Sequence, residues 1–420
     1  MINEKIYLNG KITLLDYIDY SYGLNSSRAA LFYKKSADAG SFKIRYGKSN
    51  DGFVNSFVLA GGVPLFKWRS SKSETFYHAG FGINNIENGS SDEKKTQTDE
   101  IKERDIETAF TNSLNLLEKL DTGFYLLTFA DHYPVGLDAK FFGELSNNPL
   151  RYKFNYTASA ARAFPAYLAP ASPASSYDID KINHYRKAMR NGEFIFSSAI
   201  YFDDFISVIL RGHHKAAAAY LEGRIIPCLT VIPCSGYAHD NKSVTSLFFA
   251  SNQIDASGIT SDFLFEMMQN KNKKIITEAE TIGYLSKTSD EWNKRHELFI
   301  DESTDGKFLK IKTIEGISII KDISDDRINS LLSSPSPDYK SLEMLFDVLT
   351  GLNDGRAYAL ALKLAGSESY LGLWPQAFSH LAAFKNKEVE KLFVDYLIND
   401  EYGLSDITKI IDAYFEHDRI

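Results

Sequence analysis

The chain contains only two cysteines, Cys228 and Cys234, among its 420 residues. So few thiols exclude a disulfide-stapled scaffold and are typical of a protein in a reducing compartment. The sequence also lacks a run of roughly 18 apolar residues, the length that a membrane-spanning helix needs, and its first residues lack the apolar core of a signal peptide. These absences predict a cytoplasmic protein that does not enter the membrane.

Basic charge and a phosphate-binding P-loop are missing as well. The formal net charge is −8 at pH 7 and the pI is about 5.7, whereas proteins that coat a nucleic-acid backbone carry a basic excess. Nucleic acid is therefore not the expected partner, and only a local basic groove would change that view. The stretch YGKS at 46–49 ends like a P-loop, but position 42 is Phe where the motif requires Gly. We interpret it as a hairpin turn.

The chain contains enough hydrophobic residues to form more than one core. Its length predicts two or three domains, and 44% hydrophobic residues with 29 Phe and 24 Tyr can fill them. Short aromatic and β-branched runs, punctuated by Gly and Asn, indicate strands over 1–87. Apolar residues at i, i+3 and i+4 predict a helix over about 105–120. We assign residues 1–150 to a β-rich N-terminal region.

The rest of the chain divides into a mixed region and a helical one. Residues 151–332 combine a helix that opens near Asp178 and a helix at 262–269 with three strand patterns, at 194–210, 225–232 and 308–320. The segment SSPSPD at 333–338 is typical of a linker. After it, five amphipathic segments of 12–14 residues predict a helical C-terminal domain over 338–420, which we expect to contact a protein partner. The predicted fold class is mixed α/β (α+β).

The stretch ILRGHHKAAAAYLEGRIIPCLTVIP at 209–233 concentrates the polar chemistry. It predicts a strand, a turn, a helix with four consecutive alanines, and another strand. The helix would begin among Arg211, His213, His214 and Lys215, although a helix N-terminus already carries partial positive charge. A bound anion would stabilise this group of potential cations, and the anion we expect is a nucleotide phosphate. The alternative is an ordinary βαβ unit with exposed polar residues at its turn.

The order of motifs around this stretch resembles the ParB/sulfiredoxin-like domain, over about residues 160–235. The match runs from FPAYLAPAS through DIDKINHYRKAMRNG and the strand pair IFSSAIYFDDFISVIL to RGHHKAAAAYLEG and RIIPCLTVIP. In that family a Gly-His-His-Arg-type turn binds the phosphates of ATP or CTP. The resemblance implies that Gly212, His213, His214 and Lys215 line a phosphate site, largely through backbone N–H groups.

Several positions depart from the family pattern. Arg211 stands where the family has an acidic residue or Gly, and Lys215 replaces an Arg, so that a bidentate fork becomes a point charge. His213 occupies the position of the sulfiredoxin cysteine, and the two cysteines of this chain lie elsewhere, which argues against repair of oxidised peroxiredoxin. A DNA-binding helix-turn-helix is not evident over 236–332, which argues against chromosome partitioning.

The function we expect is nucleotide binding coupled to NTP hydrolysis or phosphoryl transfer. Such chemistry needs carboxylates for Mg²⁺ and for a base. Asp178, Glu193 and His214 are the candidate catalytic residues, and Asp178 is also the candidate magnesium ligand. In the alternative interpretation, Asp178 and Asp180 only open a helix, where acidic residues are favoured.

Two other functions stay open. The first is a non-catalytic scaffold that keeps the same fold and binds a protein through its helical domain. The second is a ParB-like nuclease or nucleic-acid-processing factor. The pair Asp131-His132 follows a predicted buried strand, where it either takes part in catalysis or begins a loop.

Overall fold

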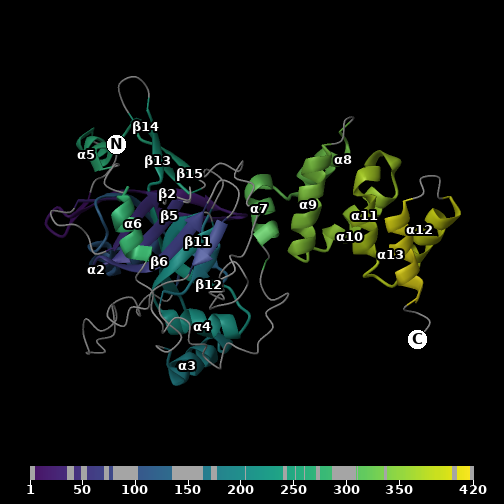
Figure 1. Ribbon diagram of the computed structural model, residues 1–420, viewed down its shortest axis with the longest axis horizontal. Helices are drawn as coiled ribbons and strands as arrows, with labels where there is room; N and C mark the ends of the chain where they lie inside the picture. Colours follow the sequence, from purple (N-terminus) through teal and green to yellow (C-terminus); the bar gives the residue numbers. More distant parts are fainter. Residues whose placement is uncertain are drawn as a thin grey trace. The chain divides into compact units, whose positions relative to one another are not determined.

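The chain divides into two compact units, Met1–Phe308 and Leu309–Ile420 (Figure 1). The computed structural model describes residues 5–35, 42–48, 54–70, 75–78, 103–134, 164–171, 177–203, 205–239, 244–250, 252–259, 261–270, 275–285, 309, 311–334, 338–399 and 404–416. Within these ranges, no helix is both long and apolar enough to span a bilayer. The combination of sheets and helices confirms the mixed α/β (α+β) class.

The first unit is built on an eight-stranded mixed sheet with the strand order β1-β2-β3-β8-β12-β10-β11-β9. Alternating burial is typical of an amphipathic strand, but most residues of the central strands are buried on both faces. The strands are β1 (Lys5–Tyr7), β2 (Ile12–Tyr22), β3 (Asn25–Lys34), β8 (Gly123–His132), β9 (Tyr167–Ala169), β10 (Ser197–Asp203), β11 (Ile206–Arg211) and β12 (Ile226–Pro233).

Five of these strands close into a ring. Tyr133, directly after β8, forms a parallel bridge with Tyr167 of β9. The Tyr133 N–H donates to the Ala166 carbonyl at 2.8 Å, and the Leu168 N–H donates to the Tyr133 carbonyl at 2.9 Å. The ring therefore runs β8-β12-β10-β11-β9 and back to β8. The fully buried His132 side chain lies inside it, with its Nε2 3.0 Å from the Ser207 Oγ of β11.

Two smaller antiparallel sheets and six helices complete the described part of this unit. One sheet is β4-β5-β6-β7 and the other is β13-β14-β15. Their strands are β4 (Phe42–Lys48), β5 (Val54–Ala60), β6 (Val63–Ser70), β7 (Thr75–His78), β13 (Gly236–His239), β14 (Val244–Phe249) and β15 (Asn252–Asp255). The helices are α1 (Ile106–Asn112), α2 (Leu114–Leu117), α3 (Ile179–Arg190), α4 (His213–Leu221), α5 (Ser261–Asn270) and α6 (Glu278–Leu285).

Helix α5 confirms the helix predicted at 262–269, whereas the helix predicted over 105–120 breaks into α1 and α2 at Ser113. Thr111, Asn112 and Ser113 are weak helix formers, which favours an interruption there. The hairpin turn expected at YGKS is wrong for residues 46–48, which belong to β4, while residue 49 lies outside the described residues. Gly47 has a packing role instead, because a Cβ there would fall 1.9 Å from a hydroxyl oxygen of α6. This glycine serves close packing of a helix on a strand.

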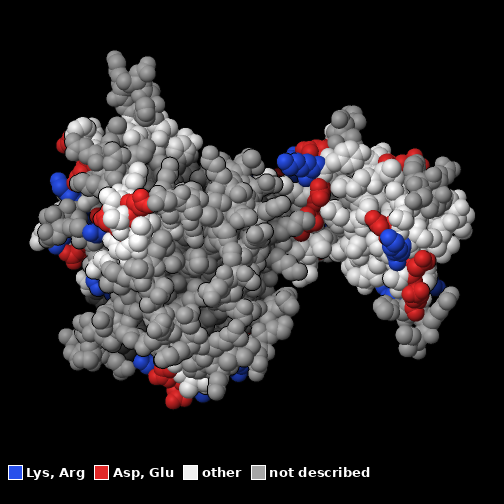
Figure 2. All heavy atoms as spheres, viewed as in Figure 1, with Lys and Arg blue, Asp and Glu red and all other residues white. Residues whose placement is uncertain are grey.

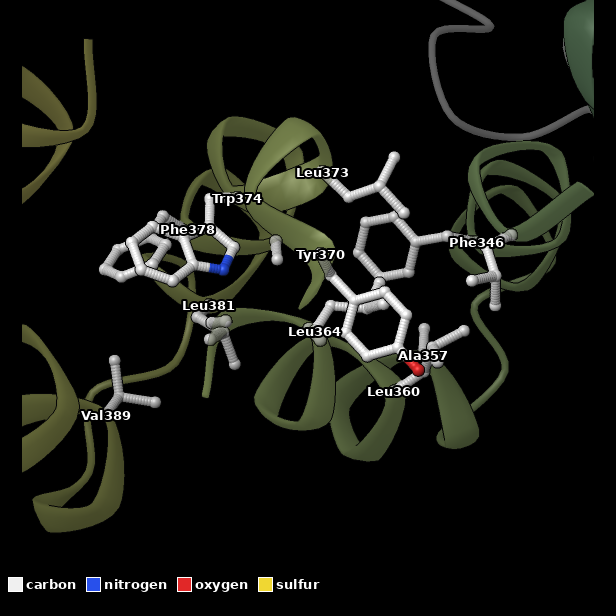
Figure 3. Close-up of a cluster of buried hydrophobic side chains, with 14 of the residues drawn as sticks. Phe346, Ala357, Leu360, Leu364, Tyr370, Leu373, Trp374, Phe378, Leu381 and Val389 are labelled. Atoms are coloured by element: carbon white, nitrogen blue, oxygen red, sulfur yellow. The ribbon is translucent and has the colours of Figure 1, made fainter. Parts of the chain in front are cut away.

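The second unit is helical throughout its described residues, and the five predicted C-terminal helices are confirmed. Asp338 and Asn386 cap the first turns of α9 and α12 through their side chains. The apolar faces meet in one core that includes Phe346, Leu360 and Phe378 (Figure 3). The elements are α7 (Ile311–Ile320), α8 (Asp325–Leu332), α9 (Tyr339–Gly351), α10 (Arg356–Ala365), the 3-10 helix η5 (Glu368–Leu373), α11 (Trp374–Leu381), α12 (Lys387–Ile398) and α13 (Ser405–Glu416).

The strand expected near 308–320 is wrong, because this segment forms α7. Its isoleucines favour a strand locally, but Ile314 and Ile317 are buried at helical spacing. Gly316 lets α7 approach α9 closely, since a Cβ there would lie 2.5 Å from a Val348 methyl. Residues 309–332 thus belong to the helical unit, and the segment expected to be an interdomain linker instead joins α8 to α9, although 335–337 lie outside the described residues.

Candidate functional site

The alanine-rich helix α4 lies at one end of the ring of strands. It connects the end of β11 to the start of β12, and both meet the start of β10, where Arg211 pairs with Ser198 and Cys228 with Ser197. Figure 1 shows α4 below the strands and α3 beyond it. The predicted strand-turn-helix-strand order is confirmed. The βαβ topology of the alternative is wrong, because β11 and β12 run in opposite directions with β10 between them. Its other part, a turn whose polar residues bind no anion, stays open.

Helix α4 starts at a glycine that no other residue replaces easily. Gly212 is the N-cap and has a φ of 86°, in the left-handed region that L residues rarely adopt. A Cβ at this position would lie 2.9 Å from the Ser197 Oγ and 3.3 Å from the Ser197 Cα. The Ser197 hydroxyl donates to the Gly212 carbonyl at 3.0 Å. Strand β10 therefore holds the turn through direct contact, and the cap contributes no side chain to the first helical turn.

Helices α3 and α4 lie side by side and point in the same direction. At their N-termini, the Asp178 N–H donates to the His214 Nε2 at 3.0 Å. At their C-termini, Arg186 and Arg190 both donate to the Glu222 carboxylate, with shortest N···O distances of 2.7 Å. The positive ends of two helix dipoles thus meet at the same place. The α3 end is capped by the Asp178 carboxylate, whereas α4 has glycine as its cap.

His213 is buried and is not one of the cations that the sequence pattern suggested. Its side chain is 7% exposed, and its Nε2 accepts the Ala171 N–H at 3.4 Å. Burial, reinforced by the neighbouring His214, lowers the pKa of His213 to about 3. The imidazole is neutral near pH 7, so the side chain adds no positive charge to the turn.

Lys215 places its ammonium group near two aromatic rings, one on α3 and one directly before β10. The Nζ lies 5.5 Å from the centroid of the Tyr185 ring and 5.5 Å from that of the Phe196 ring. Tyr185 stands about 10 Å along α3 from Asp178, given a rise of 1.5 Å per residue. The ammonium group is therefore drawn toward the middle of α3. Arg211 is half-buried at the end of β11, next to the turn.

Of the two candidate carboxylates, the structure brings only Asp178 to the turn. Asp178 Oδ1 accepts the N–H groups of Asp180 at 2.9 Å and Lys181 at 3.3 Å. These bonds, with that from Lys181 first, hold the pKa of Asp178 below its usual range, and the nearby His214 adds to the effect. Glu193 follows the other end of α3, about 18 Å along the helix axis. It is exposed, and its N–H donates to the Ala188 carbonyl.

Magnesium at this turn would depend on Asp178 and on the ligand itself. Among the residues that the structure describes, no cluster of three or more His, Cys, Asp or Glu side chains is arranged to hold a metal ion. Mg²⁺ is commonly held by one or two carboxylates together with substrate phosphates and water. The exposed carboxylate of Asp178, beside the start of α4, fits that role.

Two contributors to the site were not foreseen. Ser197 carries no signal in the sequence, because its role depends on which strand lies behind Gly212. Tyr177 packs its ring against both histidines, with centroid distances of 6.2 Å to His213 and 5.5 Å to His214. Only its position next to the helix start marks it in the sequence.

The pair Asp131-His132 is structural. His132 Nδ1–H donates to the Ala130 carbonyl at 3.0 Å, which leaves Nε2 to accept the Ser207 hydroxyl. Burial lowers the pKa of His132 to about 4, and its side chain is 0% exposed. Asp131 points the other way and forms an ion pair with Arg104. A substrate in solvent does not reach this histidine.

Comparison with known proteins finds no relative of this chain. No protein-family model, curated protein or solved structure matches the chain. The ParB/sulfiredoxin-like resemblance of about residues 160–235 therefore rests on the order of the sequence motifs, and it stays a prediction.

Proposed function

We propose that the turn at residues 211–215 binds the phosphate groups of a nucleotide, ATP or CTP. The observation that carries the proposal is the meeting of two parallel helix N-termini, one capped by Asp178 and the other by Gly212. Each helix N-terminus is equivalent to roughly half a positive charge. An anion at the start of α4 would offset the charge that the glycine cap leaves uncompensated.

The composition of the first turn of α4 supports the same proposal. Acidic residues occupy the first turn of α1, α3, α8 and α12, whereas α4 has none and begins with two histidines and a lysine. Helices α2, α7, α9, α10 and α11 also lack an acidic first turn, and α10 shares the glycine cap of α4. An external anion would stabilise α4 more than it would stabilise a helix with an acidic first turn, such as the adjacent α3. The Gly-His-His-Lys order resembles the phosphate turn that the family resemblance implies, whereas Arg211 and Lys215 depart from the family pattern and would contribute positive charge of this chain's own.

The chemical part of the proposal, NTP hydrolysis or phosphoryl transfer, rests on Asp178. Its carboxylate would hold Mg²⁺, which neutralises phosphate charge when bound. His214 is the nearest imidazole, but its Nε2 accepts the Asp178 N–H. That bond fixes the ring beside the turn, so His214 acts as a positioning group there. Glu193 has no part in this proposal, because it lies at the other end of α3.

The test is a thermal-shift titration of the full chain with ATP, CTP and GTP, with and without Mg²⁺. A nucleotide present at one hundred times its Kd stabilises the folded state by about 2.7 kcal/mol, which is a readable shift. The Arg211→Gln/Lys215→Gln variant should bind at least about tenfold more weakly, since a hydrogen bond to a charged group contributes about 1.5–3 kcal/mol.

Lys181→Gln/Lys187→Gln is the charge-matched control, because it removes two exposed positive charges that lie on α3 and not at the turn. It should bind the nucleotide as the unmodified chain does. Binding that weakens equally in the control and in the Arg211→Gln/Lys215→Gln variant would indicate nonspecific attraction to positive charge. No shift with any nucleotide, from a chain that is folded, would contradict the proposal.

The helical unit favours a second candidate function, a scaffold that binds a protein. Val394, Leu397 and Ile398 lie at i, i+3 and i+4 on α12, with exposures of 42%, 42% and 73%. On the face drawn in Figure 2, much of the described surface of this unit is neither acidic nor basic. The nucleotide titration separates the two functions, since a pure scaffold would give no shift with any nucleotide.

A further inference from the structure

The outer edge of β2 is longer than the strand that covers it. β1 pairs with Ile12, Thr13 and Leu14 only, while β2 continues to Tyr22. On its other side, β2 pairs with β3 along its whole length. Among the described strands, β1 is the neighbour of β2 on the outer side. An edge of this kind presents backbone N–H and C=O groups that can pair with another chain.

The direction of these groups follows from Ser21. Its N–H donates to the Asn252 Oδ1 at 3.3 Å, and its carbonyl accepts the Asn252 Nδ2 at 2.6 Å. Both backbone groups of Ser21 therefore point away from β3. Backbone direction alternates along an antiparallel strand, and the irregularity in register lies earlier, between Leu14 and Asp16. Asp19 and Tyr17 consequently point to the same outer edge.

Side chains hydrogen-bond to the backbone of Ser21 and Tyr17 at this edge, and the third residue, Asp19, carries a charge. The amide of Asn252, the first residue of β15, satisfies both backbone groups of Ser21 as a partner strand would. The Tyr17 N–H donates to the Asp16 Oδ1 at 2.8 Å. Asp19, between them, is an exposed carboxylate, and charge on an edge strand opposes pairing.

We infer that Asp16, Asp19 and Asn252 together block addition of a strand to β2, and that the strand they exclude is β2 of a second copy of this chain. An antiparallel pair of β2 edges, related by a two-fold axis at Asp19, places Tyr17 opposite Ser21 of the other copy. That ladder needs the Ser21 N–H, the Ser21 carbonyl and the Tyr17 N–H, and side chains now occupy these three groups. The same axis brings two Asp19 carboxylates together, which disfavours the pair further.

Removal of the three blocks tests this inference in the full chain. The unmodified protein and the Asn252→Ala, Asp16→Ala/Asn252→Ala and Asp16→Ala/Asp19→Thr/Asn252→Ala variants would be compared by light scattering after gel filtration over a range of concentrations. The fraction of dimer should rise in that order. Gln253→Ala is the matched control, because the Gln253 amide donates to Ser246 within its own small sheet. It should behave like the unmodified protein.

A cross-link tests the register. In an Asn252→Ala background, Asp19→Cys places two cysteines opposite each other across the proposed axis, within the reach of a disulfide. Oxidation should give a covalent dimer, whereas Leu24→Cys, at the exposed hairpin turn, should not. Asn252→Asp is a milder variant, because aspartate keeps the shape of asparagine but cannot donate a hydrogen bond to the Ser21 carbonyl. A folded triple variant that stays monomeric at every concentration, or equal cross-linking from both cysteine positions, would overturn the inference.

Discussion

Gly212→Ala should destabilise the first unit more than the same change at another left-handed glycine. Gly192, which follows α3, has a φ of 81° and no atom within 4 Å of the place that a Cβ would take, so Gly192→Ala costs only backbone strain, about 1–2 kcal/mol. Gly212 has a φ of 86° and adds contacts of 2.9 Å and 3.3 Å with Ser197. Crowding of this kind costs about 1–3 kcal/mol, so the expected total is about 2–5 kcal/mol.

The assay is urea unfolding followed by circular dichroism, with hydrogen exchange of the α4 peptides as a local readout. Ser197→Gly completes a double-mutant cycle, because it removes the Oγ and Cβ that a new methyl group would contact. The Ser197→Gly/Gly212→Ala protein should recover about 1 kcal/mol or more of the crowding cost. Equal losses from the two glycine variants, or a coupling energy of zero, would refute the reasoning about Ser197.

Three further predictions concern other parts of the chain. Because the pKa of His132 falls from 6.5 to about 4 on folding, the unfolded state binds more protons between these values. His132 alone should therefore contribute a decrease of about 3 kcal/mol in stability as the pH falls from about 6.5 to about 4, and a His132→Gln variant should show a smaller decrease in urea midpoint. Gly316→Ala should destabilise the helical unit by about 1–3 kcal/mol in thermal unfolding, whereas Gly355→Ala, with open space around it, should be close to neutral. Glu222→Gln should loosen the α3–α4 pair and speed hydrogen exchange in both helices, since the arginines, Arg190 first, hold the Glu222 pKa near 2.

Local patterns predicted the helices best. Each C-terminal helix carries apolar residues at helical spacing, and Asp338 and Asn386 mark two of the starts. The same reasoning placed α3 after Asp178 and α4 after Gly212. It failed for α7, where β-branched residues favour a strand and close packing on α9 overrides that preference.

Local sequence patterns could not predict the ring of strands or the charge state of the candidate site. The bridge between Tyr133 and Tyr167 joins two distant segments, and the sequence pattern of either segment alone does not predict that they pair. For the site, the pattern counted His213 as a cation, but the fold buries it beside Tyr177 and lowers its pKa. The sequence also treated Asp178 and Glu193 alike, and the length of α3 separates them.

The ring also constrains the order in which its strands can pair as the chain is synthesised. β2 and β3 are joined by a tight turn, so this hairpin is a local structure that forms early. β8 adds to β3, and its other edge stays open until β12, far along the chain, arrives to pair with it. During that interval β8 presents an apolar strand with an unpaired edge, which is a species prone to aggregation. Closure by β12 is therefore the step at which a folding helper would protect this protein most.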